Sequence, residues 1–139
     1  MANTFKVVTF AAEPNAAGTP YTVYTAASGT TTVVIGLILT NIHTSQVTAE
    51  VELVSDTGSR GGANNVTNGT SFLAKDVPIP AGSSLELLSG GKVILETTDA
   101  IRIDCSVADK LSGTLSIMEI TSCLILVMNQ PQTFKHLQP

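Results

Sequence analysis

Apolar and polar residues alternate with a period of two along most of the chain, most clearly from residue 101 to residue 107. Ile101 and Ile103 take one set of alternate positions there, and Arg102 and Asp104 take the other. A period of two sends successive side chains to opposite faces of a sheet, so this segment predicts a strand with one dry and one wet face. The same reasoning predicts about eight or nine strands, over residues 3–10, 21–26, 30–42, 46–54, 71–79, 84–88, 92–96, 101–107 and 110–121.

Two stretches predict how neighbouring strands connect. Ser89, Gly90 and Gly91 separate the apolar segments 84–88 and 92–96, a pattern typical of a hairpin, and the strand over 101–107 would complete an antiparallel meander. Prolines and a glycine break up residues 11–20, which therefore predict a loop.

The strand over 30–42 is apolar on both faces in its middle, which predicts that both faces are covered. Gly36 at its centre indicates a bulge or the close approach of another backbone. Thr48, Glu50 and Glu52 are expected on the wetter face of their strand unless a partner covers them. The predicted core comprises Val33, Ile35, Leu37, Leu39, Val51, Leu53, Leu87, Val93, Leu95, Ile101, Ile103, Leu115 and Ile117.

Short strands at close spacing, without a capped segment of helical period, predict an all-β protein. We expect an antiparallel β-sandwich over residues 1–121, either immunoglobulin-like or jelly-roll-like, with helix below about 10%. Residues 122–139 depart from the pattern. We interpret them as a C-terminal extension whose apolar run 124–128 is an extra strand or a contact arm, with a packed or frayed terminus as the alternative.

Composition limits the classes of function. Charged residues are 13% of the 139, against about a quarter in ordinary soluble domains, and mean hydropathy is +0.31. The surplus of apolar surface is expected to meet a partner or another copy of the chain. Net charge is −4 and no basic cluster occurs, which argues against nucleic-acid binding.

The sequence has no secretory signal pattern and no apolar run near the roughly 20 residues that span a bilayer. We therefore expect synthesis in the cytoplasm, no membrane partner, and reduced thiols at Cys105 and Cys123. Cys105 lies on the apolar face of its strand, which favours a buried structural thiol.

Residues that could carry chemistry are few. His43 lies in a turn between strands and His136 near the C-terminus, and no Gly-x-Ser-x-Gly or Cys-x-x-Cys motif occurs. Asp104 and the other strand carboxylates are expected on a solvated sheet face, and Glu86 and Glu96 on the two strands of the predicted hairpin. The sequence thus predicts no enzyme, no catalytic or metal-binding residue and no cofactor.

Contact residues are expected in segments that the core does not require. Residues 55–70 are rich in Gly, Asn and Thr without periodicity, as binding loops often are. The candidate contact residues are Phe5, Arg60, Gly61, Leu126 and Phe134.

Four phrases in the chain resemble a known kind of protein: Y-T-V-Y-T-A-A-S-G-T-T-T-V-V-I-G-L-I-L-T-N from Tyr21, K-D-V-P-I-P-A-G-S-S-L-E-L-L-S-G-G-K-V-I-L-E from Lys75, A-I-R-I-D-C-S from Ala100, and T-L-S-I-M-E-I-T from Thr114. Together they resemble small β-sandwich virion structural proteins of tailed bacteriophages, marine ones especially, over residues 21–121.

The resemblance implies a virion protein, made in the host cytoplasm, whose partners are copies of itself and major capsid, tail or neck proteins. A capsid decoration or cement protein is the first expectation, and a neck, tail, baseplate or fibre component the second. A ligand- or carbohydrate-binding β-sandwich module and an enzyme are the alternatives from other classes.

Overall fold

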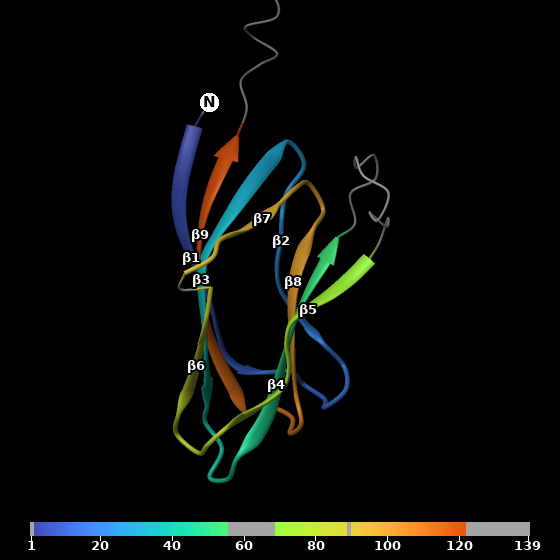
Figure 1. The fold of residues 1–139 in the computed structure, drawn as a ribbon, viewed down its shortest axis with the longest axis vertical. Helices are drawn as coiled ribbons and strands as arrows, with labels where there is room; N and C mark the ends of the chain where they lie inside the picture. Colours follow the sequence, from blue (N-terminus) through green and yellow to red (C-terminus); the bar gives the residue numbers. More distant parts are fainter. Residues whose placement is uncertain (1, 56–68, 89, 122–139) are drawn as a thin grey trace, which may run out of the picture.

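The computed structural model describes residues 2–55, 69–88 and 90–121, which form nine strands and no helix (Figure 1). Residues 56–68 of the predicted loop 55–70 and the predicted extra strand 124–128 lie outside the described residues, whereas Ser55, Gly69 and Thr70 belong to strands. The strands are β1 (Ala2–Glu13), β2 (Tyr21–Thr25), β3 (Thr30–Asn41), β4 (Val47–Ser55), β5 (Gly69–Ile79), β6 (Ser84–Leu87), β7 (Val93–Leu95), β8 (Ala100–Cys105) and β9 (Leu111–Thr121).

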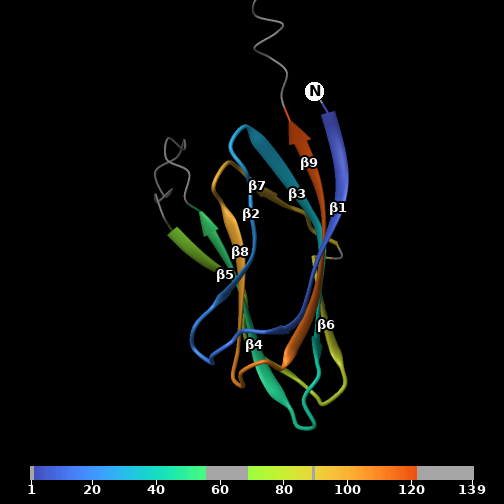
Figure 2. The same cartoon turned by 180° about the vertical axis from the view of Figure 1, so that it is seen from behind.

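Two antiparallel sheets face each other, as the opposite views in Figures 1 and 2 show. One sheet has the order β1-β9-β3-β6, with β7 also paired to β3, and the other has the order β2-β8-β4-β5. The chain crosses repeatedly from one sheet to the other, and β6 and β7 share one position beside β3. This order is that of a jelly roll, the double Greek key of eight strand positions. The predicted all-β sandwich is confirmed, in its jelly-roll form.

The predicted meander is wrong. β6 pairs with residues 37–40 of β3, and β7 pairs with residues 32–34 of the same strand. Both run antiparallel to β3, so the chain does not reverse between them, and β8 lies in the other sheet. A bulge in β3, between Val34 and Gly36, separates the two pairing segments. The pairing of β6 and β7 with β3 is therefore interrupted at the position of the bulge, between Val34 and Leu37.

The bulge also reverses which β3 residues point inward. Val34 is fully buried before the bulge and Leu37 and Leu39 after it, so the inward set changes from even to odd numbers. Val33 and Ile35, predicted in the core by strict alternation, are only half-buried. The bulge expected at Gly36 is confirmed.

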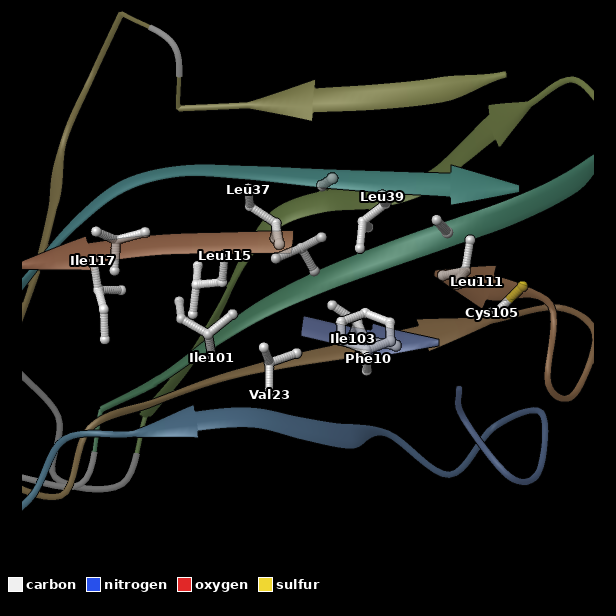
Figure 3. Close-up of a cluster of buried hydrophobic side chains, with 14 of the residues drawn as sticks. Phe10, Val23, Leu37, Leu39, Ile101, Ile103, Cys105, Leu111, Leu115 and Ile117 are labelled. Atoms are coloured by element: carbon white, nitrogen blue, oxygen red, sulfur yellow. The ribbon is translucent and has the colours of Figure 1, made fainter. Parts of the chain in front are cut away.

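The core lies between the sheets, where leucines and isoleucines of β3 and β9 meet those of β8 (Figure 3). Of the predicted core, Leu53, Leu87 and Val93 are half-buried. The predicted core residues that are buried are Leu37, Leu39, Val51, Leu95, Ile101, Ile103, Leu115 and Ile117.

The N-terminal strand is longer than predicted. β1 continues to Glu13 across a register shift after Phe10, so residues 11–13 belong to a strand and not to the predicted loop. Phe10 lies opposite Gly113 of β9, and its ring covers the space that a side chain at Gly113 would need. The same ring packs at 5.3 Å from the Tyr21 ring, between centroids, which fastens β1 to the second sheet.

Candidate interaction surface

Four apolar side chains form a continuous row across the outer face of the first sheet. Phe5 of β1 is opposite Met118 of β9, Met118 is opposite Val33 of β3, and Val33 is opposite Ile94 of β7. Directly opposed residues share a sheet face, and Met118 alternates with the fully buried Ile117, so this row points away from the core. We call Phe5, Met118, Val33 and Ile94 the apolar row.

Large parts of the apolar row are open to solvent. Phe5 is 73% exposed and Ile94 52%, while Met118 and Val33 are half-buried between them. The rows on either side hold Ile120 and the exposed Val7. Contiguous exposed apolar surface is uncommon on monomers and marks interaction sites. This face is therefore a candidate contact surface.

The apolar row reaches the free edge of its sheet. β1 is an edge strand of twelve residues, and its residues from Ala2 to Val7 are exposed on both faces. It contains no proline, so its outer N–H and C=O groups can accept another strand. The structure places the predicted contact residue Phe5 at this edge. The other four candidates, Arg60, Gly61, Leu126 and Phe134, lie outside the described residues.

A polar cluster between the sheets holds the exposed part of β1 in place. Lys6 Nζ lies 2.6 Å from Glu119 Oε1 on β9, and the Tyr24 hydroxyl of β2 donates to Glu119 Oε2 at 2.6 Å. The same hydroxyl is 2.8 Å from Thr32 Oγ1 of β3. The hydrogen bond from Lys6 and then that from Tyr24 lower the pKa of Glu119. Burial, aided by Glu119, raises the pKa of Tyr24 to about 12.

The outer face of the second sheet has a different chemistry. Glu50 is opposite Asp104, and Glu52 is opposite Arg102. Arg102 donates from Nε and Nη2 to Glu52 Oε2, at 2.9 and 2.6 Å. The guanidinium of Arg102 covers Glu52, which is only 8% exposed. The prediction that Glu52 lies on a wet face is therefore wrong.

A shallow hollow of about 140 Å³ on this face gathers three carboxylates, those of Glu50, Asp76 and Asp104. Lys75 pairs with Glu50, and its Nζ lies 3.7 Å from Asp76 Oδ2. The expectation that Asp104 is solvated is wrong. It is 9% exposed, and its Oδ1 accepts the N–H groups of Gly18 and Cys105, at 3.1 and 2.8 Å.

The described carboxylates of the hollow all have partners. Its carboxylates are held by Lys75 and by backbone donors, and His43 is not among its lining residues. Cys105 is buried as predicted, and burial raises the pKa of its thiol, which disfavours the nucleophilic thiolate. Within ranges 2–55, 69–88 and 90–121, no group of three His, Cys, Asp or Glu residues is arranged to hold a metal ion.

Sequence analysis did not identify Asn41, at the end of β3. It is fully buried, and its Nδ2 donates to the carbonyls of Ser45 and Ile79, both at 2.9 Å. Its Oδ1 accepts the N–H of His43 at 2.7 Å. Asn41 therefore joins the β3–β4 turn to the end of β5. A polar residue that ends a long apolar strand just before a turn was the available signal.

Comparison with protein-family models gave no match, and no curated protein matched the sequence. Two solved structures are similar to this chain at low scores. One is infectious bursal disease virus, Gx strain, at 15% identity and a TM-score of 0.45, covering 84% of this chain and 32% of that one. The other is the Bacillus endospore appendages, described as a family of disulfide-linked pili, at 15% identity and a TM-score of 0.42, covering 86% and 87%.

The chain thus spans about a third of the length of the first of these proteins. At such identities and scores, neither likeness bears on the function of this chain. In the part of the chain that the structure describes, no helix is long and apolar enough to cross a membrane.

Proposed function

We propose that the protein is a non-enzymatic structural component of a virus particle, most specifically a decoration or cement protein on the capsid of a tailed phage. The observation that carries the proposal is the uncovered apolar row on the outer face of the first sheet, next to the open edge of β1. Contiguous exposed apolar surface marks interaction sites, and a protein built into an assembly requires such sites.

The sequence and the fold support the same role. The phrases quoted from residues 21–121 resemble small virion proteins of tailed phages, and jelly rolls are a common architecture of viral capsid domains. Fold analogy by itself does not assign function, because jelly rolls also serve lectins and other proteins. The contact surface and the resemblance therefore carry more weight than the fold.

The carbohydrate-binding alternative has less support. Modules of that kind present aromatic side chains as platforms. Both tyrosines of this chain are half-buried in the sandwich, Tyr21 against Phe10 and Tyr24 through its hydroxyl to Glu119, and the chain has no Trp. A neck, tail, baseplate or fibre component remains the alternative place on a particle.

Repetition explains how modest contacts suffice. Symmetry repeats each contact over the particle, and effective concentration adds affinity to every further contact that one copy makes. In this proposal the N-terminal edge with Phe5, the loop with Arg60 and Gly61, and the extension with Leu126 and Phe134 supply those contacts. The partners are other copies and a major capsid, neck or tail protein.

Quantitative mass spectrometry of purified particles tests the role. We expect this chain at a fixed, multiple-copy ratio to the major capsid protein, and its absence from particles would contradict the proposal. Deletion of residues 130–139 should leave the chain folded and lower that ratio. A ratio equal to the wild type would refute the extension as an anchor and leave the sheet face as the contact.

A further inference from the structure

We propose that the apolar row is the site at which two copies of this chain pack face to face through their first sheets. The inference concerns the protein by itself in solution and does not require the virion role. It rests on the charge of the two sheet faces, on the pattern of the row and on the size of the surface.

Charge selects the face. Every copy has a net charge of −4, so contact between copies is opposed wherever carboxylates gather. On the second sheet, the carboxylates of Glu50, Glu52, Asp76 and Asp104 outnumber the cations Lys75 and Arg102. Two such faces would repel each other.

The first sheet is neutral around the apolar row, and the one carboxylate registered on the same outer face, Glu86 of β6, lies farther along β3, opposite Ile38. The row itself is uncharged, and so are the two registered rows beside it, Asn3–Ile120–Thr31 and Val7–Ser116–Gly36. Lys6, the one cation of the exposed half of β1, is paired with Glu119 on the inner side of the sheet. Two copies can therefore approach at the apolar row without bringing like charges together.

The row is complementary to itself. When two sheets stack about a two-fold axis that lies between them, the row meets either its own residues in the same order or its own residues in reverse order. In the first case Phe5 faces Phe5, and in the second it faces Ile94. Both arrangements place apolar groups opposite apolar groups, because every member of the row is apolar.

The size of the face is close to what an interface requires. Four strands about 4.8 Å apart, with about 3.3 Å of length per residue along β9, give the whole outer face, the position of Glu86 included, roughly 700 Å². A stable interface takes about 800 Å² from each partner, so a second sheet of the same size fits the requirement. Two hollows on the described surface are lined by residues outside the apolar row, and a flat sheet face suits another sheet better than a small ligand.

Sedimentation equilibrium of the full chain over a concentration series tests the inference. We expect a monomer–dimer equilibrium whose dissociation constant rises at least about tenfold in Phe5→Glu and in Ile94→Glu, because each buries a carboxylate in an apolar contact. Ile42→Glu is the matched control, since Ile42 is 48% exposed but lies in the turn after β3, away from the row. It should change the constant less than about threefold.

Circular dichroism on each variant checks that it is folded. Phe5→Glu is the decisive variant, because Phe5 is the most exposed member of the row. A wild type that stays monomeric at every concentration would overturn the inference. The apolar row would then be covered by the chain's own extension or by another protein, and the proposed virion role would be unaffected. A dimer that Phe5→Glu weakens no more than Ile42→Glu would overturn it as well.

Discussion

At the scale of single residues, the buried Asn41 and the partly exposed Glu119 join neighbouring elements of the sandwich. Asn41 donates to the carbonyls of Ser45 and Ile79 and accepts from the N–H of His43. Glu119 of β9 contacts Lys6 of β1 and Tyr24 of β2. A buried polar group that loses its partner costs more than the bond itself contributed. Asn41 is therefore expected to stabilise the fold well beyond its share of buried area, and the ion pair of Glu119 with the half-exposed Lys6 to contribute less.

Replacement of Asn41 by Ala should be strongly destabilising. It leaves the carbonyl of Ile79 and the N–H of His43 without their present partner, and each unsatisfied buried group costs about 1–3 kcal/mol. We expect urea unfolding to show a loss of about 2–4 kcal/mol. Ile42→Ala, at the exposed neighbour, should cost below about 1 kcal/mol. Equal losses in the two variants would show that the hydrogen bonds of Asn41 are not important.

The Glu119 cluster should make stability depend on pH in the acid range. Lys6 and Tyr24 lower the pKa of Glu119, so its contribution is present above the unfolded-state pKa, about 4.3, and is lost as pH falls through the lower folded-state pKa. The difference in melting temperature between wild type and Glu119→Gln should therefore be constant from about pH 6 to about pH 8 and should shrink below about pH 4.

Lys6→Met is the control for that experiment. It removes the hydrogen bond that contributes most to the lowered pKa of Glu119, so it should reduce the same acid-range dependence, and adding Glu119→Gln to it should change little more. A gap that stays constant down to pH 2, roughly two units below the ordinary pKa of Glu, would contradict an ionised Glu119 as the stabilising species.

At the scale of elements, most strands could be predicted because their alternation is regular. β4 and β8 follow the pattern of one buried and one polar face, and β9 lies within the predicted 110–121. What failed were features that depend on a neighbouring strand. The bulge in β3 reverses the inward set and separates β6 from β7, and neither effect is visible in the local pattern of 84–96. A Gly-rich linker looks the same whether the chain turns back or continues.

The β3 bulge can be tested by paired truncations. Val34 is fully buried, and its neighbour Val33 lies in the apolar row on the outer face. Val34→Ala should cost about 1–2 kcal/mol more than Val33→Ala in urea unfolding, because it removes buried methyl groups and leaves a cavity. The opposite ranking would restore the strict alternation and place Val33 in the core.

At the scale of the whole molecule, composition could predict surplus apolar surface but not its position. Low charge and positive mean hydropathy pointed to a covered surface. Its location depends on strand order, because β1, β9, β3 and β7 come from distant parts of the chain and meet only in the jelly roll. Phe5 could be proposed as a contact from its terminal position, whereas Met118, Val33 and Ile94 could not, because nothing local distinguishes them from core residues.

A cryo-electron microscopy map of purified particles tests the central claim, that the chain is a repeated structural component, most directly. We predict jelly-roll density of this chain at positions related by the symmetry of the particle, on the outside of the capsid if it is a decoration protein. Density on the neck, tail or fibre would support the structural role and assign the chain to that part of the particle instead of the capsid. Particles whose fully assigned map contains no copy of the chain would contradict the account.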